Sequence, residues 1–500
     1  MNAGLVTFDF PLQYTRADVA TRPTAVDSPL ARRLSERGIS TTTPLVSIAG
    51  RDPGAGGGIR DARDLASCVE ALRRDEVDCL LIEVFHWARI PLVVELVDKL
   101  NVPTAIVAVT AGGWNGVPCA GAICGSLRES PRSSAAALVE SFLEEDSDTL
   151  LRWISGASAL SRTRRSRVML WGGTFGAEMP YTRSDSASLE RLFLREVLTE
   201  QEEVLVERAR NIVSGQHARV DSFLGWLSSN GADLRVDGKM ATPAALDFQV
   251  GLYLAARDRL DELETAQEPI AAASIKCHYE MSITCQGCTA CLLPAFLPFA
   301  QDAEGARRIV PFACEGDLNG VVTVALLHAL NPAVPPLFGD LVSFKKDHVL
   351  LRNCGGASVY WAGRSLEPKR SLSRVRLAAN LHGKSGAAVH YESPAGEAVT
   401  FARLYREGGQ FRMLVGEGHV VEEAASTRYE DPWPHTRLDL GVDPKLLFRC
   451  APCNHGSLTE GCLATEIETA CGYAGVPVYR CDDAESLRRL LASRQAGLEG

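Results

Sequence analysis

The sequence predicts an α/β protein in which two doubly wound parallel-sheet domains precede a C-terminal β-rich domain of barrel-like character. Three observations support this fold class. Short unbroken apolar runs alternate with amphipathic helical patterns, which is typical of a parallel sheet that helices cover on both faces. The alternation starts again after a Ser- and Arg-rich stretch at 158–167. Beyond about residue 346 it gives way to short alternating runs separated by Gly, Pro and charged residues.

The first domain is expected over residues 1–165, with an extended arm, residues 1–43, in which no periodicity is evident. Its later elements are expected in this order: strand 45–50, helix 61–74, strand 77–84, helix 90–100 and strand 104–110. The Gly-rich segment 51–60 matches neither the phosphate-loop motif nor a dinucleotide-binding motif in the right register. We therefore interpret it as a flexible loop.

The central domain, residues 166–345, repeats the alternation of strands and helices. Its elements are expected in this order: strand 167–173, a long helical region over 185–265, strand 271–277, helix 288–299, strand 309–315, helix 318–329 and strand 335–344. The C-terminal domain, residues 346–500, is expected to be a β-meander or barrel with a short α/β tail at 463–481.

Charge and composition exclude several classes of protein. The chain of 500 residues has 52 Lys and Arg against 62 Asp and Glu, a net charge of −10, and no long basic run. General nucleic-acid binding and binding to anionic membranes are therefore not expected. No apolar stretch reaches the length of a membrane span, and the first residues lack the basic and apolar regions of a secretory signal. We expect a cytoplasmic protein.

Two carboxylates next to apolar strands are the strongest candidates for chemistry. Glu315 ends the strand at 309–315, Asp317 follows it, and Asp340 comes after the apolar run of the next strand. Ligands of α/β sheets bind beyond the carboxyl ends of the strands, and neighbouring carboxylates repel unless a proton or a cation joins them. The pair Glu315 and Asp340 therefore indicates a metal or acid–base site. The structural alternative is that Asp317 caps the next helix and Glu315 is an ordinary loop charge.

A third candidate is His455, in a loop at 450–461 that is too rich in Gly, Pro and polar residues to be plain core. The alternative is a loop imidazole whose hydrogen bonds are satisfied locally.

The 15 cysteines are the least usual feature of the composition. In a reducing compartment cysteines are buried thiols, metal ligands or catalytic groups rather than disulfides. Cys285, Cys288 and Cys291 form a C-x₂-C-x₂-C run, and Cys314 lies near them in the predicted sheet. These four thiols are alternative ligands for an iron–sulfur cluster or for zinc. The structural alternative is that they are simply buried.

The order of these motifs resembles that of the L-fucose isomerase family, which is related to the L-arabinose isomerases. The motifs that carry the resemblance are CEGDLNG (314–320), LFGDLVSF (337–344), LRNCGG (351–356) and NHG (454–456). The resemblance implies that Glu315, Asp340 and His455 bind Mn²⁺ or another divalent ion. It also implies that Glu315 and Asp340 form the acid–base pair of catalysis.

The activity implied by this resemblance is metal-dependent isomerisation of an aldose to a ketose, on a pentose or deoxyhexose, through an enediol. A hard divalent ion can hold two neighbouring sugar oxygens, and a carboxylate on each side can carry the protons. The small-molecule sugar is the expected partner. Family members are homo-oligomers, commonly hexamers, and we expect the same here.

Three further residues are implied substrate contacts. Asn454 adjoins the ligand His455, and Lys276 lies where the family has a polar contact, although the usual Gln is absent. Trp114 follows a strand of the first domain, and in the family a tryptophan from a neighbouring subunit's first domain can close the sugar pocket. The alternative for Trp114 is that it packs under its own loop.

Two other functions remain open at this point. The first is a lyase or redox enzyme on the same scaffold that uses a cysteine-ligated iron–sulfur or zinc site. The second is a non-catalytic sugar-binding or regulatory relative that keeps the carboxylates without the activity.

Overall fold

The computed structural model describes residues 1–9, 28–44, 58–129, 139–265, 268–345, 347–422 and 433–496. The chain forms two compact units, which we describe separately. The first comprises residues 1–162 with 468–473, and the second comprises 163–467 and the segment from 474 onward. The predicted strand 45–50 and most of the Gly-rich loop 51–60 lie outside the described residues.

The first unit contains a five-stranded parallel sheet of order β2-β1-β3-β4-β5. Its strands are β1 (Asn2–Thr7), β2 (Ser40–Thr42), β3 (Cys79–Val84), β4 (Thr104–Ala108) and β5 (Val139–Leu143). Its helices are α1 (Pro29–Glu36), α2 (Ala62–Arg74), α3 (Ile90–Leu100), α4 (Val117–Glu129) and α5 (Ser147–Arg164).

Helices cover both faces of this sheet because successive strand residues point to opposite sides. Leu80 and Ile82 of β3 pack into one core with α2, α3 and α4. Cys79 and Leu81, one residue out of step, pack into a second core with α1 and α5. The unbroken apolar strands of the sequence follow directly from this two-sided burial, and the doubly wound prediction is confirmed for this unit.

The N-terminal segment differs from the extended arm expected over residues 1–43. Residues 2–7 form β1, which is an inner strand paired with β2 on one side and β3 on the other. The strand is short and contains Gly4, so periodicity alone did not reveal it. The hydrogen bonds of β1 to β2 on one edge and to β3 on the other stabilise the strand, and a local sequence pattern does not reveal such pairing.

The second unit begins with a four-stranded parallel sheet of order β12-β9-β6-β7. Its strands are β6 (Arg167–Trp171), β7 (Glu196–Glu200), β9 (Ile270–Ile275) and β12 (Phe312–Cys314). Its helices are α6 (Ser186–Leu192), α7 (Glu202–Gly215), α8 (His217–Ser229), α9 (Pro243–Leu263), α10 (Leu292–Phe296) and α11 (Leu318–Leu330). Short helical turns lie at η4 (Gly176–Glu178), η5 (Pro180–Thr182) and η6 (Cys277–Cys285). The region 185–265 is therefore not continuously helical, because β7 interrupts it.

A closed barrel of six antiparallel strands completes this unit, as the β-rich prediction required. The barrel order is β17-β20-β13-β14-β19-β18, and pairing of β17 with β18 closes it. The strands are β13 (Leu337–Phe344), β14 (Val349–Arg352), β17 (Ala398–Glu407), β18 (Gln410–Val420), β19 (His435–Asp439) and β20 (His455–Glu460). A further strand, β21 (Val478–Arg480), joins β18 in parallel.

The remaining elements surround these layers. A small sheet of order β16-β15-β8 contains β8 (Asp233–Leu234), β15 (Arg376–Ala379) and β16 (Ala387–His390), and β10 (Gln301–Asp302) pairs with β11 (Gly305–Ala306). The short helices are α12 (Tyr360–Gly363), α13 (Pro368–Leu372), α14 (Pro444–Cys450), α15 (Ala464–Tyr473) and α16 (Ala484–Ala496).

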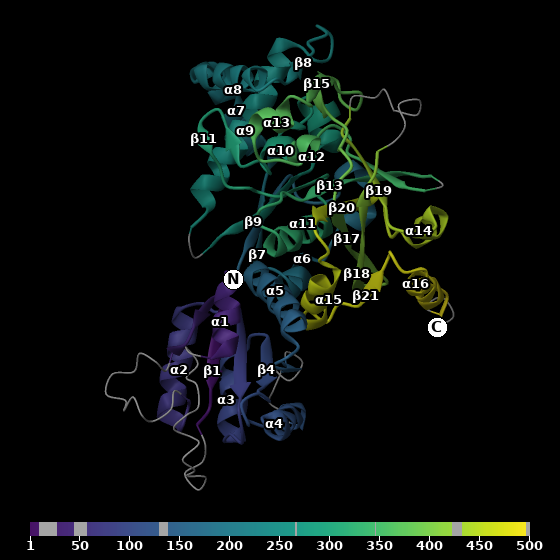
Figure 1. The fold of residues 1–500 in the computed structure, drawn as a ribbon. Coiled ribbons are helices and arrows are strands. Elements are labelled where there is room, and N and C mark those ends of the chain that lie inside the picture. The colour runs from purple at the N-terminus through teal and green to yellow at the C-terminus, as the bar shows by residue number, and fades with distance from the viewer. Residues whose placement is uncertain are drawn as a thin grey trace. The chain divides into compact units, whose positions relative to one another are not determined.

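Helix α11 lies between the sheet and the barrel of the second unit (Figure 1). It contacts β9 and β12 on one side and β17 and β20 on the other. Almost all of its residues are buried, in keeping with the sequence LNGVVTVALLHAL, which is apolar on every face. Residues at the start of α11 are therefore held by both layers.

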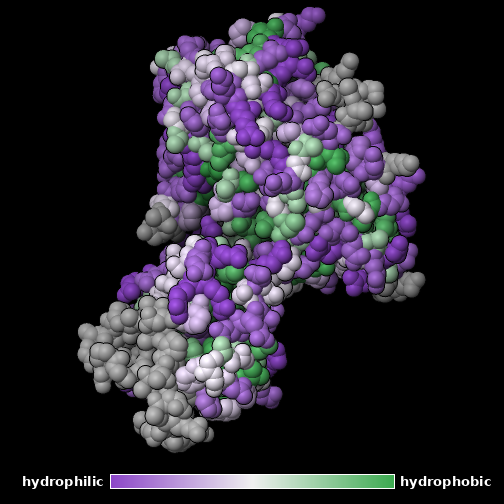
Figure 2. Space-filling model, viewed as in Figure 1, coloured by the Kyte–Doolittle hydropathy of each residue, from purple (hydrophilic) through white to green (hydrophobic). Residues whose placement is uncertain are grey.

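The visible surface of the second unit is mainly hydrophilic, with apolar residues scattered over it (Figure 2). Among the described residues, no helix combines the length and the apolar character that a membrane crossing requires.

Candidate active site

The turn after β12 carries Glu315 and Asp317. Glu315 has a φ of +65°, and its carbonyl accepts a hydrogen bond of 3.1 Å from the backbone N–H of Gly176 in η4. Asp317 is the N-cap of α11, where its Oδ1 accepts from the N–H of Gly320 at 3.0 Å. The expected helix cap is thus present, and it leaves Glu315 facing a cavity beyond the strand end.

Asp340 has a different setting from the one that the sequence suggested. It lies within β13 of the barrel, antiparallel to its neighbours, and not after a strand of the parallel sheet. In the barrel register Asp340 is directly opposite His455 of β20. The apolar run Leu337–Phe338 is equally typical of a strand in either layer, so the sequence pattern did not distinguish the two.

His455 connects three carboxylates. Its Nδ1 lies 2.7 Å from Oδ2 of Asp317, and its Nε2 lies 3.2 Å from Oε2 of Glu315 and 3.5 Å from Oδ1 of Asp340. Asp317 is also paired with the fully buried guanidinium of Arg403 on β17. With Nδ1–H donating to Asp317, Nε2 is directed at Glu315 and Asp340 and becomes the ligand nitrogen for an ion when its proton is lost.

Burial and mutual charge shift the pKa values of the imidazole and the carboxylates in different directions. Burial lowers the pKa of His455, but the carboxylates of Asp317, Glu315 and Asp340 outweigh burial and raise it well above the usual range. Burial raises the pKa of Glu315, yet contact with His455 brings it below its usual value. Burial and the charge of Glu315 raise the pKa of Asp340 to about 6. The site therefore favours one positive charge among its carboxylates.

A divalent cation fits this donor set. The buried carboxylates of Glu315 and Asp340 both face Nε2 of His455 and repel one another. A cation bound between these three groups would relieve the repulsion. Asp317 holds the far side of the ring, as carboxylates commonly do behind metal-binding histidines. Glu315, Asp340 and His455 are thus suited to hold such an ion.

A cavity of about 360 Å³ opens in front of these residues. That volume is in the usual range for sites that bind small molecules. Its polar wall carries Glu315, Asp340 and Asn454, and its other lining residues include Arg352, His382 and Trp433. The rings of His382 and Trp433 are stacked with centroids 4.6 Å apart.

The predicted substrate contacts have three different settings. Asn454 lines the cavity, donates from its amide to Asp340 and accepts at 2.6 Å from the hydroxyl of Tyr181. Lys276 follows β9 and pairs with Glu280 at 2.5 Å, and it does not line this cavity. Trp114 belongs to the first unit and lies in the loop between β4 and α4. There it packs edge-on against Phe85.

The four candidate cluster cysteines differ in burial, although Cys291 lies near enough to Cys288 and Cys314 for their charges to interact. Cys285 is exposed, whereas Cys288, Cys291 and Cys314 are buried. The amide of Asn380 donates to the Cys291 sulfur at 3.1 Å, and that of Asn353 donates to the Cys314 sulfur at 3.5 Å. Within the described part of the chain, no three of these thiols approach closely enough to share an ion.

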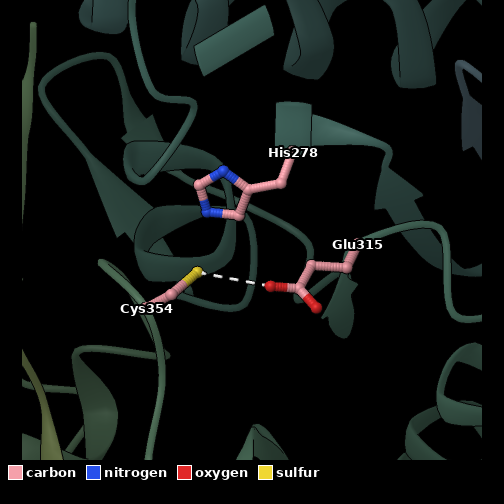
Figure 3. A group of neighbouring side chains, drawn as sticks. All are labelled: His278, Glu315 and Cys354. Atoms are coloured by element: carbon pink, nitrogen blue, oxygen red, sulfur yellow. Dashed lines mark hydrogen bonds between the residues drawn. The ribbon is translucent and has the colours of Figure 1, made fainter. Parts of the chain in front are cut away.

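Several residues of the site were not predicted as functional from the sequence. Arg403 and Tyr181 come from segments far from the motifs and act by contacting Asp317 and His455. His278 and Cys354 line the cavity beside Glu315, and their ligand atoms lie within 4.8 Å of its carboxylate and of one another (Figure 3). The sequence offered only a weak signal for these two residues. His278 directly follows Cys277, and Cys354 is the cysteine of the LRNCGG motif.

The second unit thus joins a parallel sheet to a closed barrel, with carboxylates and an imidazole at the junction. Residues 351–481 match the family model described as "L-fucose isomerase, C-terminal domain", so this segment is similar to that domain. The matched segment carries Cys354, Asn454 and His455, while Glu315 and Asp340 precede it. No curated protein matches the chain.

Proposed function

We propose that this protein is a divalent-metal-dependent aldose–ketose isomerase that acts on a pentose or deoxyhexose through an enediol. The observation that supports the proposal most strongly is the contact of His455 Nε2 with both Glu315 and Asp340, at 3.2 and 3.5 Å, beside a cavity of sugar size. The family match of the C-terminal domain supports the same reaction class.

Glu315, Asp340 and His455 would hold the ion, with Mn²⁺ the expected occupant. When bound, the ion would polarise the sugar carbonyl as a Lewis acid and orient the sugar through two adjacent oxygens. Asp317 keeps His455 in the tautomer whose Nε2 lone pair faces this place, and Arg403 keeps Asp317 ionised. The donor set suits a divalent ion, and Mn²⁺ is the one that the family resemblance implies.

The two carboxylates that line the cavity are suited to move protons. One carboxylate takes the proton from C2 of the aldose, O1 gains a proton, and a cis-enediol results. The proton on O2 then leaves and C1 receives a proton, which gives the ketose with no net loss or gain. Positioned acid–base groups contribute about 10²–10⁴-fold to such steps.

The rest of the cavity would orient the sugar. The amide of Asn454, next to Asp340, can contact a hydroxyl at the reacting end. Trp433 lies between the His382 ring, stacked at 4.6 Å, and the Arg352 guanidinium, 4.3 Å from its ring centroid, and this group would form one wall of the sugar site. Asn454 precedes β20 of the barrel, whereas His382 comes from the turn between β15 and β16 of the small sheet.

The test is an isomerase assay on a panel of pentose and deoxyhexose aldoses, with metal analysis of the purified protein. Glu315→Gln and Asp340→Asn should each abolish ketose formation and leave the protein folded. The matched control is Glu207→Gln, an exposed carboxylate on α7, which should keep full activity. An active Glu315→Gln/Asp340→Asn double variant would refute the site.

The same metal analysis separates the proposal from its alternative. Iron with labile sulfide in the purified protein would support the lyase or redox function instead. A protein that binds sugar, retains no metal and never forms ketose would support a non-catalytic relative.

A further inference from the structure

We propose that the cavity carries a second metal position, formed by His278, Glu315 and Cys354 and suited to zinc or a similar borderline-soft divalent ion. One ligand atom of each residue lies within 4.8 Å of the other two. The three side chains come from η6, from the turn after β12 and from the loop after β14, and they converge on one point (Figure 3). All three also line the cavity, so a small ion has access to them.

The spacing of the ligand atoms is close to that of a tetrahedral zinc site. Zinc at its usual bond lengths holds neighbouring sulfur, nitrogen and oxygen ligands about 3.4–3.6 Å apart. The Cys354 thiol already donates to Oε1 of Glu315 at 3.6 Å. Only the imidazole has to approach, and by at most about 1.4 Å to reach that spacing from the 4.8 Å limit.

The imidazole of His278 is oriented for this role. Its Nδ1 is engaged by the hydroxyl of Ser282 at 2.7 Å, so its Nε2 is the nitrogen left for an ion. The ring edge away from the Cβ atom is turned toward Cys354 and Glu315 (Figure 3). A hydrogen bond behind a metal-binding histidine is the usual device that fixes ring and tautomer.

The loop that carries Cys354 is held in place by its neighbours. The side-chain oxygen of Asn353 accepts from the N–H groups of Gly355 and Gly356 at 3.3 and 3.2 Å. A Cβ atom on Gly355 would lie 2.2 Å from the sulfur of Cys291, so the loop packs directly on that residue. Cys291 therefore supports the loop, and Cys354 is the thiol that it presents to the cavity.

This position differs in chemistry from the site of the proposed isomerase. Glu315 is shared, with Oε1 toward Cys354 and Oε2 toward His455. The thiolate and imidazole favour zinc or cobalt, whereas the Asp340 side of the cavity offers oxygen ligands that suit Mn²⁺. Three protein ligands with a fourth position open to the cavity are typical of a catalytic or substrate-binding zinc and not of a closed structural one.

Cobalt titration of the metal-free full-length protein tests the proposal directly. Cobalt bound by a thiolate gives a sulfur-to-metal charge-transfer band in the near ultraviolet, which oxygen and nitrogen ligands do not give. We expect the band in the wild-type protein, its loss in Cys354→Ser, and its retention in the control Cys453→Ser, a half-buried thiol in the loop before His455. Ser282→Ala should weaken zinc binding about 10–100-fold.

Asp340→Asn separates this proposal from the isomerase proposal, because it should abolish ketose formation and keep the cobalt band. Absence of the band in the wild-type protein, or an unchanged band in Cys354→Ser, would overturn the second metal position. If the variants do not fold, alkylation of Cys354 in the wild-type protein gives the answer. Zinc should slow it at least tenfold, and equal rates with and without zinc would refute the proposal.

Discussion

His455 is positioned by groups on both edges of its ring, and Asp317 is the most important of them. Asp317 caps α11, accepts from His455 and pairs with Arg403, all in a fully buried place. Burial raises the pKa of its carboxyl, but the charges of Arg403 and His455 outweigh burial and hold it well below its usual range. One short side chain thus joins the helix, the barrel and the imidazole.

Asp317→Asn should destabilise the protein by about 3–5 kcal/mol, because it leaves Arg403 charged and buried without its counter-ion. It should also weaken divalent-metal retention by about 10–100-fold through loss of His455 orientation. Urea unfolding and dialysis with metal analysis measure the two effects. The control Glu95→Gln removes half of an exposed helical ion pair and should cost about 0.3–0.5 kcal/mol. A loss for Asp317→Asn no larger than that of the control would contradict the prediction.

Glu202 at the start of α7 gives the stability of the protein a further pH dependence. Burial, followed by the charges of Glu280 and Glu203, raises its pKa from 4.5 to about 8. Between these values the unfolded chain releases a proton that the folded protein keeps, so this group makes folding less stable as the pH rises from 4.5 to 8.

The Glu202→Gln variant should remove that contribution. Relative to the wild-type protein, its free energy of unfolding should improve as the pH is raised from 5 to 8, as urea unfolding at both values would show. Glu207→Gln, an exposed carboxylate on the same helix, should show no such trend. A constant difference between Glu202→Gln and the wild-type protein at both pH values would contradict the assignment.

At the scale of elements, η4 supports the turn that carries Glu315. A Cβ atom on Gly176 would lie 2.1 Å from the Glu315 carbonyl oxygen, so a larger residue there must displace the turn. Gly176→Ala should therefore cost about 1–3 kcal/mol of stability and lower kcat. Gly215→Ala at the end of α7 has nothing within 4 Å of its added Cβ and should be neutral or slightly stabilising. Equal behaviour of the two variants in thermal unfolding and activity would show that close packing on Glu315 is unimportant.

The sequence predicted where individual strands and helices lie better than which sheet each strand joins or which side chains meet. The strand at Phe312–Cys314 and the helix after it were recognisable because an apolar run ends at a capping Asp. The strand around Asp340 was also recognised, but not its place in the barrel, since an apolar run does not state which sheet it joins. The convergence of His278 and Cys354 depends on residues 76 positions apart and has no local signature.

At the scale of the whole molecule, the predicted fold class is confirmed: two parallel-sheet units and a closed β-barrel. Periodicity sufficed for this because burial on both faces and burial on one face leave different patterns in a strand. The inner position of β1 was missed, because pairing on both edges and not its own short sequence stabilises it.

The expected homo-oligomer, a hexamer as in the family, and the cytoplasmic location remain predictions. Light scattering after size exclusion should give a mass near six chains. If Trp114 closes the sugar pocket of a neighbouring subunit, Trp114→Ala should raise KM several-fold with no change in mass or in thermal unfolding. An unchanged KM would favour the simpler role of packing against Phe85.

The burial of α11 between the sheet and the barrel has a consequence for how the protein loses activity. Glu315 and Asp317 stand at its start, and the strands that carry Arg403 and His455 pack against it. Neither layer can open without exposing this apolar helix to water, so partial melting of one layer alone is strongly disfavoured. Inactivation by heat and loss of the second unit's tertiary structure should therefore coincide in one cooperative transition, with no active intermediate.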